Sequence, residues 1–594
     1  MTIAQRQTAQ SASTLNPITA EIVRHALLSI PNQIDANIMR TAFSPLIYEY
    51  KDFAVGIVDA EGKLICQAKG GIPLFVANAL GVAVRDGLAV HGADGIEDGD
   101  ILITNHAATM GQHLNNVVMY TPIFAGPDKR DLFGFMAVLV HWIDIGGITV
   151  GSFLSSDTTS VFQEGIQYRS VKLWSRGKPQ KDIYSIVQTN TRFPHMLMGD
   201  LESQIAGCLL GRTKVAEVIG KYGLDTVRAS VEAMWDRSEA SMRKALREIP
   251  DGTYEAESFI DNDGVELDRR VPVRVVVHVA GDEMTVDFSG VAEQARGPIN
   301  SGREGGAVAA ARIALKYLAM PDEPPNDGCF RPLHVLIPDG KLISAGADAP
   351  LGAYSTVLPT VVDTIIRALV PAAPDRVAAG HHATMGLHAF EGRHENGELF
   401  QNVETSHGGW GASLGHDGAG PFKTMVHGDT RDVPVEVQEA LYPLRIERLG
   451  FREDSGGAGE FRGAPGLEKI TKALRPCEAR ISVERTGCPS WGILGGRGGA
   501  RPETYILRPG QAPAEVLKGV VKLSAGDSVR VLSGGGGGYG EPLRRDPACV
   551  AEDVRRGIVT RHAALDVYGV ELDETGQPMN TETAEQRETL RHSR

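Results

Sequence analysis

The first clear hydrophobic pattern follows Asn16-Pro17, where apolar residues recur at helical spacing over 18–38. An asparagine before a proline is typical of a helix N-terminus, so the pattern predicts a helix, which Pro31 should kink. Residues 1–15 have neither this periodicity nor the apolar segment of a signal peptide. We interpret them as a loose, disordered tail and expect no export.

Short apolar runs bounded by turn residues come next. Residues 52–67 predict two strands around a turn at 59–62. Further segments with the length and composition of strands lie at 101–104, 117–124 and 133–143. Two longer segments, 182–222 and 225–248, have helical periodicity. Together these patterns predict an N-terminal α+β domain over 16–250.

The pattern changes at Pro250-Asp251-Gly252. The alternation over 271–290 predicts a β-hairpin with its turn at 280–282, and helical segments follow at 304–319 and 360–370. We therefore predict a central mixed α/β domain over 251–445.

Beyond 446, short strands separated by glycine turns precede two helical segments. This order predicts a C-terminal β-rich region with terminal helices over 446–594. The fold class expected for the whole chain is α+β, mixed and multi-layered, with a glycine-rich, β-dominated region after the N-terminal domain.

Composition narrows the class of protein. Of 594 residues, 42% are hydrophobic and 23% charged, as in globular proteins, and 69 are glycine. Lys plus Arg number 60 against 74 Asp plus Glu, a net charge of −14, which argues against nucleic-acid binding. The apolar stretch 133–154 contains His141, Asp144 and three glycines, which argues against a membrane span. Six scattered cysteines without a CxxC pair indicate buried thiols. A cytoplasmic enzyme is expected.

Nucleotide and common hydrolase motifs are missing from the sequence. It has no G-x-x-x-x-G-K-[ST], and the glycine run 534–538 lacks the strand–turn–helix context of a phosphate loop. Convincing H-E-x-x-H and G-x-S-x-G motifs are also missing. Common hydrolase signatures therefore do not explain this chain.

The densest set of candidate metal ligands lies in the N-terminal domain: Glu49, His106, His113, Asn116, His141 and Asp144. Imidazole and carboxylate groups together suit Zn²⁺, Mn²⁺ or Fe²⁺. His113 follows a glycine turn and His141 ends a predicted strand, so both can face one pocket. On spacing alone, a polar turn histidine and a structural histidine at a strand end remain an open alternative.

Other polar residues have a structural interpretation as their default. His381 and His382 are adjacent, and neighbours on a strand point to opposite faces, so one at most would reach a given metal. His407 and His427 lie in glycine-flanked loops of the kind that line pockets. Asp52 is interpreted as a solvated turn or capping carboxylate.

Several segments, in this order, resemble the hydantoinase B/oxoprolinase family. They include SPLIYEYKDFAVGIVDAEGKLICQA, GQHLNNVVMYTPIF, HWIDIGGITVGS, TRFPHMLMGDLESQIAGC, NDGCFRPL and GGGGGYGEPLRRDP. The resemblance covers about 16–575. The family includes subunits of ATP-dependent hydantoinases, 5-oxoprolinase, caprolactamase, and acetone and acetophenone carboxylases.

The resemblance implies a division of labour. A hydantoinase A-type partner would bind ATP and Mg²⁺ and phosphorylate the substrate, while this chain would supply a site with a divalent metal, Zn or Mn, in a hetero-oligomer. Carried over from the family motifs, the metal ligands are Glu49, His113, Asn116 and His141.

This chain departs from the family motifs at two places. Asn116 stands where the family has an aspartate, and Trp142 where it has a second histidine. His106, in the segment upstream, can compensate as a ligand or a proton shuttle, and we include it with the catalytic candidates. The extra residues of the turn GPDKRD account for the wide spacing of His113 and His141.

The favoured function is hydrolytic opening of a cyclic amide of the hydantoin, lactam or 5-oxoproline type, after the partner has phosphorylated the substrate. The alternative is a subunit of an ATP-dependent, biotin-free ketone carboxylase of the acetone or acetophenone type. Asn116 and Trp142 make the expected site less charged and more aromatic, which favours an aryl ketone. A third hypothesis is a structural subunit with a decayed site.

Overall fold

The computed structural model describes residues 15–126, 131–152 and 158–592. The N-terminal helix α1 (Pro17–Thr41) is capped by Asn16, whose side chain accepts the backbone N–H groups of Ile18 and Thr19. The helix runs through Pro31 as one element. The turn that was expected to lengthen a hairpin lies mostly outside the described residues, at 127–130.

Seven strands of the described chain form the N-terminal sheet, in the order β2-β1-β5-β4-β3-β6-β7. Their pairs are antiparallel. The strands are β1 (Phe53–Asp59), β2 (Leu64–Gln67), β3 (Ile101–Thr104), β4 (Asn116–Ala125), β5 (Asp131–His141), β6 (Val171–Ser175) and β7 (Lys178–Pro179). The hairpin predicted at 52–67 and the three strands predicted after it are confirmed.

Helices cover both faces of this sheet. One face packs against α1 and α7 (Pro194–Tyr222), and the other against α3 (Pro73–Val76) and α4 (Ala79–His91). Because both faces are covered, β1 is buried along its whole length and reads as an unbroken apolar run. The remaining helices of this region are α2 (Pro45–Tyr48), α5 (Ala107–Met110), α6 (Lys181–Thr189) and α8 (Leu224–Leu246).

The second sheet has the order β11-β10-β9-β8 among the residues described. Its strands are β8 (Gly252–Ile260), β9 (Val271–Ala280), β10 (Glu283–Asp287) and β11 (Leu333–Leu336). Helix α10 (Tyr354–Ala368) packs against β8, β9 and α9 (Ala309–Ala319). The hairpin predicted over 271–290 is confirmed, with its turn between β9 and β10.

Two more sheets follow in the described part of the chain. The third has the order β13-β12-β16-β19 and the fourth β14-β15-β20-β17-β18. Their strands are β12 (Leu387–Arg393), β13 (Leu399–Thr405), β14 (Leu444–Phe451), β15 (Leu467–Ala473), β16 (Cys477–Ser482), β17 (Glu503–Leu507), β18 (Ala514–Glu515), β19 (Lys518–Leu523) and β20 (Ser528–Leu532). The third sheet joins strands from both sides of residue 445, the boundary expected between the central and C-terminal regions.

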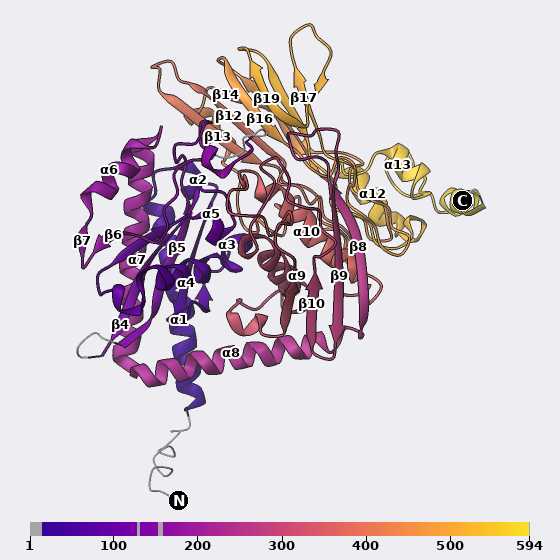
Figure 1. Ribbon diagram of the computed structural model, residues 1–594. Coiled ribbons are helices and arrows are strands. Elements are labelled where there is room, and N and C mark those ends of the chain that lie inside the picture. The colour runs from indigo at the N-terminus through magenta and orange to yellow at the C-terminus, as the bar shows by residue number, and fades with distance from the viewer. Residues whose placement is uncertain (1–14, 127–130, 153–157, 593–594) are drawn as a thin grey trace, which may run out of the picture.

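The helices of this last part are α11 (Val435–Leu441), α12 (Pro547–Arg555), α13 (Arg561–Asp566) and α14 (Asn580–His592). Figure 1 shows the N-terminal sheet and its helices at the left and the second sheet with α9 and α10 at the right. The orange and yellow strands of the C-terminal region lie across the top, and α8 runs along the bottom from the first part to the second. The mixed α+β architecture with several sheets is confirmed.

Two large apolar cores lie on the two faces of the N-terminal sheet. One combines this sheet with α1 and α7, and the other joins the opposite face to α3, α4, α9, α10 and the second sheet. The stretch Pro73–His91 is long and apolar enough to cross a membrane, but 72% of its most apolar window is buried inside the protein. Burial in the second core accounts for its composition.

Candidate functional site

Three polar side chains lie in a row across neighbouring strands of the N-terminal sheet. Asn116, at the start of β4, is the direct cross-strand partner of His141, at the end of β5. Asp52 immediately precedes β1, and its carbonyl accepts the backbone N–H of His141 at 3.1 Å. The Asp52 carboxylate also lies 3.4 Å from His141 Nδ1. Directly opposed residues share a face of a sheet, so strand pairing itself brings these side chains together.

His113 completes the group from the turn before β4. Its Nε2 lies 3.0 Å from the Oδ1 atom of Asn116, and its Nδ1 lies 3.4 Å from the carbonyl oxygen of Gly352. The rings of His113 and His141 meet edge to face, with centroids 4.9 Å apart. Tyr354, from the start of α10, packs against His113 at the same centroid distance and accepts a hydrogen bond from Asn116 Nδ2.

A small cavity of about 20 Å³ lies beside these side chains and is lined by Asp52, His113, His141 and Tyr354 among others. It has room for about one water molecule or ion. His427 and Thr430 line it from a loop between β13 and α11, opposite the N-terminal sheet. His427 Nδ1 bonds to the Thr424 hydroxyl at 2.7 Å, and its Nε2 has no hydrogen-bond partner among the described residues. The cavity therefore lies between two regions that are far apart in the sequence.

Burial controls the charge state of this cavity. It raises the pKa of Asp52 to about 7 and lowers the pKa of His113 to about 4 and of His427 to about 3. It also lowers the pKa of His141 well below the usual value, and neighbouring His113 contributes in the same direction. At neutral pH the imidazoles are therefore neutral bases, the form that binds a metal ion.

Two of the predicted site residues lie elsewhere. Glu49 ends α2, half-buried, and does not line the cavity, where Asp52 supplies the carboxylate. His106 precedes α5, and its Nδ1 bonds to the Thr109 hydroxyl at 2.9 Å, outside the cavity lining. The structure thus brings together His113, Asn116 and His141, but not Glu49 or His106.

Two further residues near the histidines also point elsewhere. Asp144 is buried and forms an ion pair with Arg192 at 2.7 Å, so its carboxylate already has a partner outside the cavity. Trp142, next to His141 on the strand, points into the opposite core and donates to Gln204. This alternation explains why Trp142 adds no aromatic surface to the cavity.

A second buried histidine pair adjoins the site from the central region. His381 Nδ1 lies 3.1 Å from the carboxylate of Asp363, which also accepts from Arg485 and from Trp491 Nε1. The Arg485 charge and these hydrogen bonds outweigh burial and lower the pKa of Asp363 to about 2. This network holds His381 as a structural residue. His407 is paired with Asp432 instead.

The donor atoms suit a divalent cation. The two ring nitrogens of His113 face two oxygen atoms, on Asn116 and Gly352, whereas a neutral imidazole carries one N–H. Within the described ranges, no three His, Cys, Asp or Glu side chains are grouped closely enough to hold a metal by themselves. Asp52, His113 and His141 therefore do not form a ready three-ligand site, and Asn116 lies beside them without lining the cavity.

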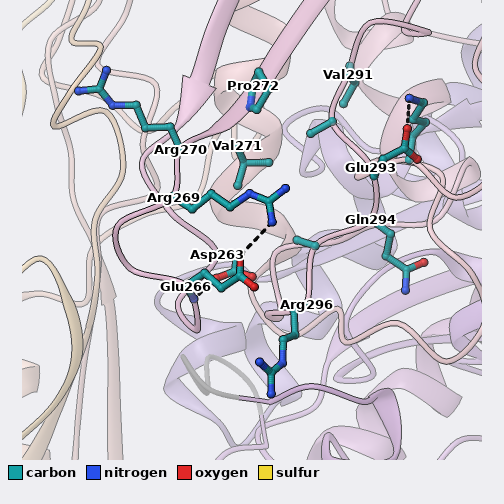
Figure 2. A pocket seen from close by; sticks show the side chains of 13 residues that line it. Asp263, Glu266, Arg269, Arg270, Val271, Pro272, Val291, Glu293, Gln294 and Arg296 are labelled. Carbon is teal, nitrogen blue, oxygen red and sulfur yellow. Dashed lines mark hydrogen bonds and ion pairs between the residues drawn. The ribbon is translucent and has the colours of Figure 1, made fainter.

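A larger cavity, of about 400 Å³, lies between the loops before β9 and after β10 (Figure 2). Its charged side chains include Arg269, paired with Glu266 at 2.9 Å, and Lys341, paired with Glu293 at 2.5 Å. Arg296 extends away from these pairs in Figure 2. No histidine or cysteine lines this cavity, and it shares no residue with the histidine cavity. We do not assign the chemistry to it.

Asp52 and His427 line the cavity but were not among the predicted site residues, and the sequence holds only local signals for them. Asp52 immediately precedes a predicted strand, and the pairing of that strand with β5 was the missing information. His427 is flanked by Gly428, whose φ of +54° belongs to a tight turn. No sequence signal tied that loop to the N-terminal sheet.

Comparisons with known proteins agree with this architecture. The Hydantoinase B/oxoprolinase family model matches residues 16–542. Caprolactamase subunit beta of Pseudomonas jessenii is 30% identical over 587 residues, covering 95% of this chain and 98% of that protein. The crystal structure of ATP-dependent caprolactamase from the same organism matches with a TM-score of 0.87 at 28% identity, covering 97% of this chain and all of that one.

Nucleotide-free acetone carboxylase shares the fold, with a TM-score of 0.87 at 19% identity, covering 97% of this chain and 83% of that one. The family and the class of ATP-dependent enzyme that the motifs predicted are therefore confirmed. With its family match over most of the length and its fold shared with caprolactamase, this chain belongs to the hydantoinase B/oxoprolinase family.

Proposed function

We propose that this chain is the B-type subunit of an ATP-dependent hetero-oligomeric enzyme that opens a cyclic amide of the hydantoin, lactam or 5-oxoproline type. A hydantoinase A-type partner would bind ATP and Mg²⁺ and phosphorylate the substrate. The observation that carries the proposal is the meeting of Asp52, His113 and His141 in one small cavity, with Asn116 paired to His141 and in contact with His113 just outside its lining. Family membership and the ATP-dependent relative support the reaction class.

The residues that would hold a divalent metal, Zn or Mn, are Asp52, His113, Asn116 and His141. Asp52 replaces Glu49 in this set because Asp52 lines the cavity and lies against His141. When bound, the metal would supply Lewis-acid polarisation of a substrate oxygen.

The protein's own groups have separate roles in the proposed reaction. Burial raises the pKa of Tyr354 well above 10, so its hydroxyl stays protonated. Because this oxygen accepts from Asn116, its proton is available to a substrate oxygen that gains negative charge when water adds to the neighbouring carbon. In the tautomer in which His427 Nδ1–H donates to the Thr424 hydroxyl, Nε2 is free of a proton and would accept a hydrogen bond from a water molecule in the cavity.

A matched pair of variants tests this assignment. With the A-type partner and ATP, we expect Asp52→Asn to lower both bound metal and ring opening at least tenfold, because it removes the carboxylate of the cavity. Glu49→Gln should change either quantity less than twofold. Metal is measured by mass spectrometry of the purified chain and ring opening by product analysis on hydantoin, ε-caprolactam and 5-oxoproline.

Circular dichroism confirms that both variants fold. Loss of metal in Glu49→Gln but not in Asp52→Asn would restore the assignment made from the motifs and reject the geometric one. A wild-type complex with neither metal nor turnover would favour the structural-subunit hypothesis.

Ketone carboxylation is the second candidate. The fold shared with acetone carboxylase is compatible with it, and the neutral Asn116 lowers the charge around the cavity. The same complex, given acetone or acetophenone with ¹³C-bicarbonate and ATP, should incorporate no label if the hydrolase proposal is correct.

A further inference from the structure

The histidine cavity is too small to hold the ring of any substrate considered above. About 20 Å³ accommodates one water or ion, whereas pockets for small ligands usually have about 300–1,000 Å³. If the proposed function is correct, the substrate's ring needs space that adjoins this cavity. A pocket of about 370 Å³ provides it, bordered by α9, the loop after it and the segment 425–429.

The two spaces are separated by a partition of two chain segments, 71–77 and 425–430. Along the first, Ile72, Leu74 and Phe75 line the histidine cavity, while Pro73 and Val76 line the larger pocket. Side chains of one short segment thus line both spaces, so this segment lies between them.

The second segment of the partition is divided in the same way. His427 and Thr430 line the cavity, whereas Met425, Gly428 and Asp429 line the larger pocket. The two segments are in direct contact, since the Leu74 N–H donates to the carbonyl of Val426 at 3.2 Å.

The partition has no spare volume between its segments. A Cβ atom on Gly428 would lie 2.5 Å from Pro73 Cδ, so the two backbones approach as closely as glycine allows. Gly428 and Pro73 therefore hold the two segments in tight contact between the pocket and the cavity.

The wall of the larger pocket suits an apolar ring. Its side chains include Val76, Ile313, Tyr317, Phe330, Trp410 and Met425. The Trp410 ring is fixed by a bond from Nε1 to the Lys423 carbonyl and packs against His381, with ring centroids 6.0 Å apart.

The charged groups of this pocket offset one another. Arg312 is paired with Asp327 at 3.0 Å, Lys316 donates to the carbonyl of Met320, and Glu323 and Asp429 add negative charge. This lining therefore suits the uncharged ring of a substrate.

We propose that this pocket is the substrate chamber, which binds the neutral ring of a lactam, hydantoin-type or aryl-ketone compound beside the histidine cavity. The proposal rests on the proposed function for the identity of the ring, but chamber binding can be measured without turnover.

The proposal is tested by filling the chamber with a larger side chain. Ile313→Trp places an indole among the apolar side chains, and Arg296→Trp adds the same group to the unrelated cavity of Figure 2 as a matched control. Saturation-transfer NMR with ε-caprolactam and with acetophenone measures binding to the full chain alone. We expect at least one of these probes to bind wild type, with its affinity at least tenfold weaker in Ile313→Trp and unchanged in Arg296→Trp.

Turnover with the A-type partner gives an independent readout. Ile313→Trp should raise KM at least fivefold and leave bound metal unchanged, because no proposed ligand is touched. If Ile313→Trp does not fold, Ile313→Phe is used and should raise KM by a smaller factor. Equal probe affinity in wild type and the filled variant, or no binding of either probe to wild type, would overturn the chamber. Probe binding without any turnover by the wild-type complex would instead reject the proposed function alone.

Discussion

At the scale of single residues, Asn116 connects two side chains that line the cavity, His113 and Tyr354. Its amide nitrogen donates to Gln112 and to the Tyr354 hydroxyl, at 3.1 and 2.8 Å, and its oxygen faces His113 Nε2. One neutral side chain therefore orients an imidazole and a phenol. Replacing it changes the charge of the site and the hydrogen bonds together.

We predict that Asn116→Asp binds Zn²⁺ or Mn²⁺ at least tenfold more tightly than wild type, because a carboxylate attracts a dication more strongly than an amide. The metal-free variant should melt at a lower temperature, since Gln112 Oε1 loses its donor and faces an oxygen instead. Competition with a chelator measures the metal affinity, and calorimetry the melting.

Asn116→Ala is the control and should weaken metal binding, because it removes the oxygen without adding charge. Equal metal affinity in wild type and both variants would show that position 116 is not a ligand.

At the scale of elements, the segment after the 3₁₀ turn Val161–Gln163 positions His113 from outside the cavity. Glu164 accepts the backbone N–H groups of Leu351 and Gly352, each at 2.7 Å, and the Gly352 carbonyl faces His113 Nδ1. Burial raises the pKa of Glu164 to about 8, although these two N–H groups act in the opposite direction.

This pKa predicts a pH dependence of stability. The folded chain keeps the Glu164 proton up to about pH 8, whereas the unfolded chain releases it near the usual glutamate pKa of 4.5. Between these values the folded state holds more protons, so its free energy of unfolding falls as pH rises. Glu164→Gln cannot titrate, and we expect wild type to lose a few °C of melting temperature relative to it between pH 5 and 8.

Thermal melts of both proteins at each pH unit give the comparison. Asp573→Asn is the control for a carboxylate near the surface. The difference in melting temperature between this variant and wild type should stay constant from pH 5 to 8. Parallel melting curves for wild type and Glu164→Gln across this range would show that Glu164 is ionised in the folded state.

At the scale of the whole molecule, the site is assembled from regions that are distant in sequence. The N-terminal sheet supplies Asp52, His113 and His141, and the segment between β13 and α11 closes the cavity with His427. Motions between these regions would therefore alter the cavity and its partition directly.

We predict that the isolated chain neither binds nor hydrolyses Mg-ATP, because the sequence has no recognisable nucleotide loop and the partner would supply that site. Isothermal titration calorimetry should detect no binding, and ring opening should appear after the A-type partner is added. Omitting ATP from the complex is the control and should abolish turnover. A micromolar dissociation constant for the chain alone would reject the two-subunit model.

Much of the architecture could be predicted locally. The strand at 101–104 and the hairpins at 52–67 and 271–290 follow from alternation and turn residues, which depend on near neighbours in the chain. The family could also be predicted, because its motifs are runs of neighbouring residues. His113, Asn116 and His141 were identified together because the resemblance to the family motifs implied them as metal ligands.

The sequence by itself determined the elements, the family and three members of the candidate site. Tertiary structure decided that Asp52 rather than Glu49 faces His141, because the pairing of β1 with β5 sets which carboxylate comes opposite that histidine. It also decided that His427, more than 280 positions beyond His141, closes the cavity. Local patterns specify where a strand begins and ends. The partners of a strand or loop depend instead on the long-range packing of the two cores. That packing places the polar groups around one cavity.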